Sequence, residues 1–392
     1  MHFDLTDEQV SFRDTAERFA REKLAPGYLD RSSVHTLDHD LVREMGSLGL
    51  LGPDIPEEFG GMGESALTAG LVTEQIAYAD FNMSYVQLLA SLMGNMVAKH
   101  ASPDIAREWV PKVVSGETMI ALGLTEPRGG SDAAGLQVRA DKSGNGWILN
   151  GEKTSISAAE QAGAAVVFAR TGGPGDTARG VSAFFVDLSE KGVTCTHFDD
   201  IGTKPAGRGS IFLDDVYVPD ECMMAAQDRA FGTIMAGFDF SRALIGLECI
   251  GPAQASVDET WGYVSEQRNA FNTPLAQFEG VSFPLAEAET QLTMMRELCY
   301  KTLRLRDANL PHTDKAAMCK WYVPKTTCEI IHQCLILHGH YGYTTETPFH
   351  QRYCDVLGLQ IGDGTAQIQK LVIAREKVGR VVLQYDQKRS KK

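Results

Sequence analysis

The local sequence pattern changes twice along the chain, and this order constrains the fold more than any other feature. Apolar residues recur with helical spacing from residue 4 to about residue 120. From about 121 to 228 the chain shows short β-type runs, such as residues 165–168, between turns rich in Gly and Asp. Long helical periodicities then return and persist to Val382. The pattern predicts a mainly helical α+β fold with domains at 1–120, 121–228 and 229–392.

The same order argues against the commonest nucleotide-binding architecture. Most such enzymes alternate strands with helices and carry a glycine fingerprint, G-x-G-x-x-G, directly after an early strand. The stretch at Gly60-Gly61 lacks that spacing and follows a helical pattern. We therefore predict a turn there, and no such fingerprint elsewhere.

Composition excludes several functional classes. The formal net charge is -14, whereas a nucleic-acid binder needs clustered Lys and Arg to displace counterions from phosphate. No stretch approaches about 18 uncharged apolar residues, and acids stand near the start where a secretory leader needs an apolar run. The 8 cysteines form no C-x-x-C pair, which indicates reduced thiols. We expect a cytoplasmic protein that binds neither nucleic acid nor membrane.

A glycine-rich segment joins the first helical block to the β block. It runs Gly123-Leu124-Thr125-Glu126-Pro127-Arg128-Gly129-Gly130-Ser131-Asp132. Its small residues let backbone N–H groups approach a ligand closely, which suits a pyrophosphate or the edge of a flavin. By chemistry alone, an ordinary interdomain linker explains the segment equally well.

This segment resembles the T-E-P-x-x-G-S-D motif of the acyl-CoA dehydrogenase family, and further family motifs follow in the family's order. They are N-G-x-K at 150–153, the strand closing the β domain at 212–219, R-x-x-F at 268–271, G-x-x-G-Y-x-x-E-x-P at 339–348, the stretch after the catalytic carboxylate at 364–369, and the last helix at 374–376. The resemblance implies an N-terminal helical domain, a middle β-barrel-like domain and a C-terminal four-helix bundle. It also implies a homotetramer that binds FAD between these domains and a neighbouring subunit.

The family's FAD contacts, transferred residue by residue, fall in separate parts of this sequence. The resemblance places Ser157 near flavin N5, and Thr365 and Gln367 on the adenosine side. Arg268 and Phe271 would reach the FAD of a partner subunit, where the guanidinium offers a fork to pyrophosphate oxygens. The alternative for Arg268 is a surface cation. The expected contacts are Leu122, Leu124, Thr125, Gly130, Ser131, Ser155, Ser157, Arg268, Phe271, Gly339, Thr365 and Gln367.

The resemblance further implies that the substrate is an acyl-CoA thioester and that electron-transfer flavoprotein reoxidises the flavin. Asp239 and Arg242 are expected to meet the acyl-CoA, although by chemistry alone they lie in an ordinary exposed helix turn. Arg375 either contacts the CoA arm or pairs with Glu376. The expected substrate contacts are Ser131, Asp239, Arg242, Gly364 and Arg375.

Asp363 occupies the position at which a glutamate of the family removes the α-proton of the substrate. Most relatives have Y-E-G-T, whereas this chain has Gly362-Asp363-Gly364-Thr365. Some relatives place the base directly before the arginine of another helix, but that position is Ser241, which cannot serve. Asp363 is therefore the expected catalytic residue. The alternative is an aspartate that caps a turn between two glycines.

The exchange of glutamate for aspartate bears on the shape of the substrate. Aspartate is one methylene shorter, so its oxygens lie about 1 Å further back, and such misplacement costs about a hundredfold in rate. Gly362 replaces a tyrosine of the family, which predicts open volume at the acyl end, and Ser155 and Leu122 also replace larger aromatic residues. A ring-closed acyl group would use that volume better than a straight chain. We expect an alicyclic acyl-CoA, specifically cyclohexane-1-carboxyl-CoA oxidised to cyclohex-1-ene-1-carboxyl-CoA.

Other functions stay open at this point. A short branched-chain acyl-CoA dehydrogenase, or a dehydrogenase of acyl groups on a carrier protein, would use the same residues. A nitroalkane oxidase-like enzyme of this fold also uses an aspartate base and passes its electrons to oxygen. Departures from the family at Arg128, Ser155 and His340 also fit a flavin-free protein that kept the fold without the chemistry.

Overall fold

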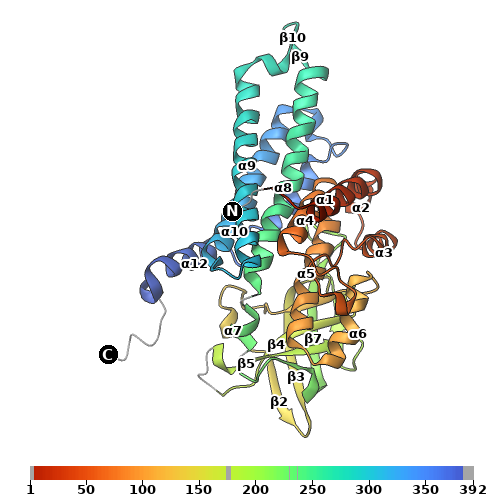
Figure 1. Cartoon of the computed structure of the whole chain (residues 1–392), viewed down its shortest axis with the longest axis vertical. Helices are drawn as coiled ribbons and strands as arrows, with labels where there is room; N and C mark the ends of the chain where they lie inside the picture. Colours follow the sequence, from red (N-terminus) through yellow and green to blue (C-terminus); the bar gives the residue numbers. More distant parts are fainter. Residues whose placement is uncertain (1–3, 174–177, 229, 236, 383–392) are drawn as a thin grey trace.

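The computed structural model describes residues 4–173, 178–228, 230–235 and 237–382 (Figure 1). A long helical arm occupies the top of Figure 1, a second group of helices lies beside its base, and a sheet occupies the bottom. The mainly helical α+β fold predicted from the sequence is confirmed. Within the described residues, no helix is both long and apolar enough to cross a membrane.

The N-terminal part of the chain is helical up to Val114. Thr6 starts the first helix with a capping box, in which its side chain accepts from Gln9 N and the Gln9 side chain accepts from Thr6 N. The fourth and fifth helices are buried almost all round, so they form the centre of this part. The helices are α1 (Asp7–Phe19), α2 (Tyr28–Ser32), α3 (His39–Ser47), α4 (Ala66–Ala79), α5 (Phe81–His100) and α6 (Pro103–Val114).

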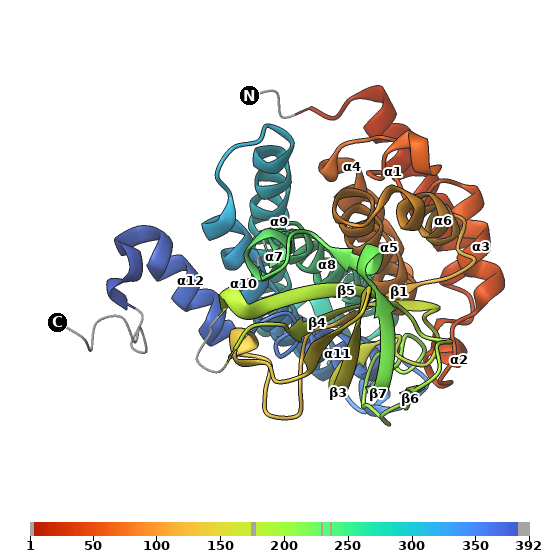
Figure 2. The ribbon, with the colours of Figure 1, turned by 90° about the horizontal axis from the view of Figure 1, so that it is seen from below.

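The middle of the chain forms one mixed sheet. Its strands pair in the order β6-β7-β3-β2-β4-β5-β8, with β1 added beside β4, so β6 and β8 are the edges. In Figure 2 these strands lie in front of α5 and of the long C-terminal helices, because the sheet covers their lower end. The strands are β1 (Ile120–Gly123), β2 (Arg139–Ser143), β3 (Gly146–Ser157), β4 (Ala164–Arg170), β5 (Val181–Asp187), β6 (Val193–Cys195), β7 (Arg208–Pro219) and β8 (Met223–Met224).

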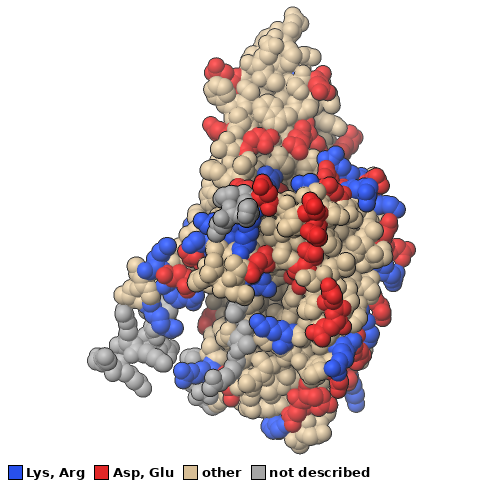
Figure 3. Space-filling view, in the orientation of Figure 1, with Lys and Arg blue, Asp and Glu red and all other residues tan. Residues whose placement is uncertain are grey.

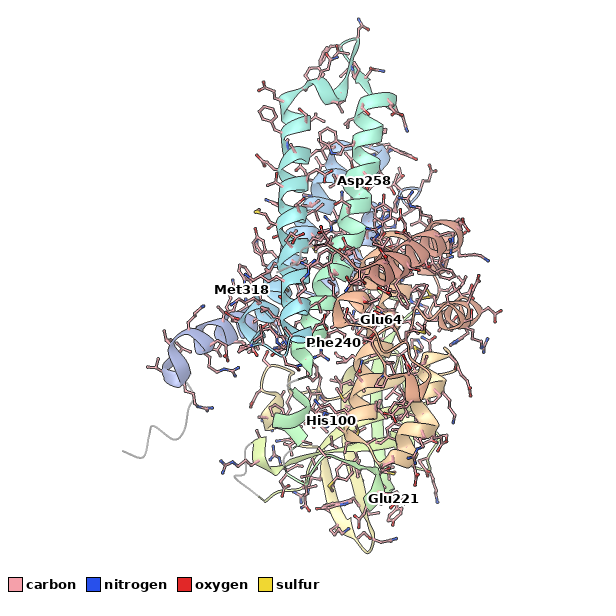
Figure 4. The ribbon with its side chains drawn as sticks, viewed as in Figure 1. Glu64, His100, Glu221, Phe240, Asp258 and Met318 are labelled. Atoms are coloured by element: carbon pink, nitrogen blue, oxygen red, sulfur yellow. The ribbon has the colours of Figure 1, made fainter. Side chains whose placement is uncertain are left out.

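The C-terminal part packs long helices against one another and against α4. The longest pair, α8 and α9, forms the arm and is joined at its tip by the short hairpin of β9 and β10 (Figure 1). Figure 4 labels Phe240 near the start of α8 and Asp258 near its far end, so α8 runs from the sheet into the arm. The elements are α7 (Ala230–Met235), α8 (Phe238–Gly262), β9 (Asn269–Ala270), β10 (Thr273–Pro274), α9 (Glu279–Asp307), α10 (Thr313–Leu337), α11 (Phe349–Gly358) and α12 (Ala366–Val378).

The segments between these parts are short. The last N-terminal helix ends at Val114 and β1 begins at Ile120, while β8 ends at Met224 and α7 begins at Ala230. Residues 1–3, 174–177, 229, 236 and 383–392 of the predicted domains lie outside the described part of the chain. The exact boundaries at 120 and 228 stay predictions. All 8 cysteines are free thiols, as expected for a reduced protein.

Candidate active site

Asp363 lies in the loop between α11 and α12, and buried polar groups fix the shape of this loop. Its φ is 53° and that of Gly364 is 88°, so both residues adopt the left-handed conformation. The Lys320 ammonium donates to the carbonyl oxygens of Leu359 at 2.6 Å and Gly364 at 3.4 Å. The Gln369 amide donates to the carbonyl oxygen of Asp363 at 3.1 Å. These hydrogen bonds therefore hold the backbone of the loop that carries Asp363.

Tyr85, which sequence reasoning missed, brings α5 to the same place. Its hydroxyl is 2.6 Å from the hydroxyl of Ser157 at the end of β3. Burial raises the pKa of Tyr85 to about 12, and the nearby charge of Asp363 contributes to this shift. The base candidate, the serine expected at flavin N5 and a tyrosine therefore converge from three separate parts of the chain. A tyrosine in the middle of an otherwise ordinary helix gives no local signal of such a role.

Glu248 is a second carboxyl group near Asp363, on α8. Its side chain is fully buried, and one of its oxygens accepts from Ser84 Oγ at 3.2 Å. Burial raises its pKa well above the ordinary range, and the charge of Asp363 adds to the effect. Its full burial and its bond to Ser84 favour a structural role for Glu248 rather than the role of the base. Ser241, buried on the same helix, donates to the carbonyl oxygen of Phe238 and offers no carboxylate.

The open volume expected beside Gly362 is bordered by Arg208 from β7. A Cβ atom built on Gly362 would lie 4.0 Å from Nη1 of Arg208, and one on Gly358 would lie 2.9 Å from Nη2. The guanidinium donates to Asp200 at 2.9 Å and to Thr203 at 2.8 Å. Arg208, a cation from the middle sheet, therefore lies beside Gly362. Sequence reasoning missed this because nothing near Gly362 in the sequence indicates Arg208.

The glycine-rich segment is an exposed loop on a buried ionic anchor. Residues 127–132 are exposed, whereas Glu126 accepts from Lys153 Nζ at 2.7 Å and from the N–H groups of Gln137 at 2.6 Å and Val138 at 2.8 Å. Burial lowers the pKa of Lys153 to about 8, against the opposing effect of Glu126. Burial alone would raise the pKa of Glu126, but Lys153 and the N–H donors outweigh it and lower the pKa. Lys153 of the N-G-E-K motif therefore forms an ion pair with Glu126 of the T-E-P motif.

The structure brings most of the expected flavin residues to one region around this loop. The N–H of Thr154 donates to the carbonyl oxygen of Thr125 at 2.9 Å, which ties the end of β3 to the loop that follows β1. Ser155 is exposed, has a φ of 55° and lies where the register between β3 and β7 shifts, as in a bulge that redirects a side chain. Leu122, Leu124, Gly130 and Ser131 lie in the same strand and loop. Exposed backbone and two serine hydroxyls fit the polar edge of a flavin.

The other expected cofactor residues lie on different elements of the chain. Thr365 accepts from the N–H of Ile368 and caps α12, Gln367 is exposed on that helix, and Gly339 is exposed after α10. Arg268 and Phe271 lie at the hairpin that forms the tip of the arm, at the opposite end of α8 from the sheet (Figure 1). The side chain of Phe271 is 93% exposed. These two residues cannot reach the region around Asp363 in the same subunit.

Of the five expected substrate residues, Asp239 and Arg242 form a buried pair, whereas Ser131 is exposed and Gly364 is half-buried. Arg242 donates to Asp239 at 2.7 Å, and Asp239 also accepts from the hydroxyl of Thr313 at 2.5 Å. Both are buried, so they do not form the exposed helix turn considered as an alternative. Nε of Arg242 has no partner among the described residues and can donate to a ligand. Arg375 pairs with Glu376 at 3.1 Å on the surface of α12, where Lys and Arg gather in Figure 3.

Sequence models of one family match all three parts of the chain. The acyl-CoA dehydrogenase N-terminal domain matches residues 6–117, the middle domain matches 121–216 and the C-terminal domain matches 229–378. Together they span the helices, the sheet and the loop that carries Asp363.

Individual proteins show the same likeness over nearly their whole length. The mitochondrial short-chain specific acyl-CoA dehydrogenase of Mus musculus is 32% identical over 376 residues, covering 95% of this chain and 90% of that protein. The probable acyl-CoA dehydrogenase YngJ of Bacillus subtilis is 31% identical over 379 residues, covering 96% and 99%. The structure of butyryl-CoA dehydrogenase from Megasphaera elsdenii superposes with a TM-score of 0.92 at 29% identity, covering 96% of this chain and all of that one.

Proposed function

The chain belongs to the acyl-CoA dehydrogenase family, and from this premise we propose that it desaturates a compact acyl-CoA thioester with Asp363 as the base. It is an FAD-dependent oxidoreductase that acts on the CH–CH bond of acyl-CoA thioesters. The observation that carries the assignment of the base is the loop of Asp363. Lys320 and Gln369 fix its carbonyl groups, and its carboxylate lies near the Tyr85–Ser157 pair.

Each step is assigned to residues of this chain. FAD, when bound, accepts hydride from the β-carbon of the acyl group at its N5 atom. Asp363 takes the α-proton, and its backbone N–H polarises the thioester carbonyl that makes this proton acidic. Glu248 is not assigned to this step, because its side chain is fully buried and bonded to Ser84. Asp239 and Arg242 bind the thioester, with Nε of Arg242 as the available donor.

We assign FAD to the exposed loop and the end of β3, with Ser157 toward N5, with Thr365 and Gln367 on its adenosine side, and with Gly339 as a further contact. Arg268 and Phe271 lie too far along the arm to serve this site, so we propose that they complete the FAD site of a partner subunit in a homotetramer. The nearly full exposure of Phe271 supports this, because a large exposed aromatic side chain on a protruding hairpin is typical of an interface. We propose that electron-transfer flavoprotein accepts the electrons of the reduced flavin.

The proposed substrate is alicyclic, with cyclohexane-1-carboxyl-CoA as the specific candidate. Because the side chain of Asp363 is short, the α-carbon of the substrate has to come close to its carboxylate. Gly362 has no side chain and leaves space beside Asp363. A Cβ atom built on Gly362 would lie 4.0 Å from Nη1 of Arg208, so this arginine lies beside the position that a tyrosine occupies in most relatives.

The test is single-turnover bleaching of the flavin without oxygen, using cyclohexane-1-carboxyl-, butyryl- and octanoyl-CoA. We expect the cyclic thioester to bleach the flavin fastest. Faster bleaching by a straight-chain thioester would contradict the alicyclic substrate, and bleaching by none of them would contradict the dehydrogenase. Because an aspartate base also suits nitroalkane oxidation, nitroethane with oxygen is the control, and release of peroxide would favour that second function.

A further inference from the structure

We propose that Tyr85 is the residue that limits the size of the acyl group this enzyme accepts. The inference deepens the function proposed above and rests on it. It concerns a residue of α5 that carries no family motif and that the mechanism does not otherwise use.

The tyrosine ring is held at both of its ends. Its hydroxyl is bonded to Ser157 of β3 at 2.6 Å, which fixes the far end of the side chain. Next to it on α5, Ser84 donates to Glu248 of α8 at 3.2 Å, which fixes the helix at the near end. Ser84 and Glu248 are both fully buried. The ring therefore cannot swing aside without breaking its bond to Ser157.

The position of the ring explains why it would restrict the acyl group. In the proposed reaction the α-carbon faces Asp363 and the β-carbon faces the hydride acceptor beside Ser157. Tyr85 is bonded directly to Ser157, so in this proposal its ring lies beside the hydride acceptor and the β-carbon. Carbons beyond the β-carbon then meet a rigid aromatic ring. A compact acyl group stops before the ring, whereas a long straight chain has to displace it.

Two kinds of substitution separate the bulk of the ring from its hydrogen bond. Tyr85→Ala removes the ring, Tyr85→Leu removes the ring but keeps apolar bulk in α5, and Tyr85→Phe keeps the ring but loses the bond to Ser157. Tyr217→Ala is the matched control, because Tyr217 is an exposed tyrosine of the middle sheet whose hydroxyl donates to Asn145. FAD absorbance and melting temperature establish that each variant is folded and loaded.

The measurement is kcat/KM for butyryl-, hexanoyl- and octanoyl-CoA, with calorimetric binding of the non-oxidisable 3-thia analogues as a second readout. We expect Tyr85→Ala and Tyr85→Leu to raise the octanoyl-to-butyryl ratio by about tenfold or more, since a few methylenes in an apolar site carry effects of that size. We expect Tyr85→Phe and Tyr217→Ala to leave the ratio within about twofold of the wild-type ratio.

The outcomes separate the two proposals. If the wild-type enzyme oxidises acyl-CoA and both smaller variants fold yet keep the wild-type ratio in both readouts, the role of Tyr85 is overturned while the proposed function stands. If Tyr85→Phe changes the ratio as much as Tyr85→Ala, the hydrogen bond rather than the ring sets the size limit, and the steric argument is wrong. If wild type oxidises neither these three thioesters nor cyclohexane-1-carboxyl-CoA, the proposed function itself fails.

Discussion

Asp363 has a left-handed backbone conformation that few side chains adopt, and this decides how its role is best tested. Asp and Asn are the non-glycine residues most often found with positive φ, so Asp363→Asn keeps the loop while removing the base. We expect this variant to bleach its flavin about 10²- to 10⁴-fold more slowly with acyl-CoA, because the gain from general base catalysis is lost. Single-turnover absorbance measures the rate, and the flavin spectrum checks that FAD stays bound.

A matched control is available on β7. Asp215 also has positive φ, at 51°, and is exposed, where it bonds Asn150. Asp215→Asn therefore repeats the same substitution in the same backbone conformation outside the site, and we expect wild-type bleaching. Wild-type bleaching by Asp363→Asn instead would show that another group takes the α-proton.

At the scale of elements, α10 supports the catalytic loop through a single buried cation. Lys320→Met leaves the carbonyl oxygens of Leu359 and Gly364 without their donor. We expect kcat to fall by about ten- to a hundredfold, since displacement of a base by about 1 Å has effects of this size. The measurement is kcat and KM together with FAD content, and Lys325→Met is the control, because Lys325 lies on the same helix in an exposed pair with Glu329. Equal loss of kcat in both variants would contradict the role of Lys320.

The buried ion pair of Lys153 and Glu126, which lies under the glycine-rich loop, leads to a prediction about stability. Lys153 is fully buried and Glu126 nearly so, so Lys153→Met leaves an uncompensated carboxylate in the interior. We expect a loss of about 3 to 5 kcal/mol in the free energy of unfolding, measured by denaturant titration. The double variant with Glu126→Gln should recover part of the loss. The exposed pair of Lys142 and Asp220 is the contrast, where Lys142→Met should cost less than about 1 kcal/mol.

An element could be predicted from the sequence when the pattern that indicates it lies within a short stretch of the chain. Helical and β periodicities arise within a few residues, so the order of helical, β and helical blocks could be inferred. The pair of Lys153 and Glu126 could also have been found, since each is a charged residue in a motif beside apolar strands. Tyr85 and Arg208 could not, because they reach Ser157 and Gly362 only through contacts between domains.

At the scale of the whole molecule, one buried carboxyl group joins all three parts of the chain. Asp355 of α11 accepts from the hydroxyl of Tyr28 at 2.9 Å, from the N–H of Thr203 at 2.6 Å and from the Gln351 side chain at 2.8 Å. Tyr28 belongs to the N-terminal helices and Thr203 to the segment between β6 and β7. Their relative placement, and so the site between them, depends on this group.

The same carboxyl group predicts how the stability of the assembled domains depends on pH. Burial raises the pKa of Asp355 to about 7, against its three hydrogen bonds, whereas an aspartate in the unfolded chain titrates near about 4. The folded protein therefore binds this proton more tightly, and the resulting stabilisation is complete below about pH 4 and lost as the pH rises through about 7. A shift of about three units corresponds to about 4 kcal/mol.

Asp355→Asn stays neutral at every pH, so we expect it to abolish this part of the pH dependence. Melting temperature measured from pH 4 to pH 8 should fall more steeply for wild type than for the variant, and the variant should be the more stable protein at pH 8. The difference between the two curves isolates Asp355, because other buried carboxyls with raised pKa, such as Glu248, are common to both. Parallel curves would mean that Asp355 keeps its charge when folded, and its three hydrogen bonds would then stabilise a buried carboxylate.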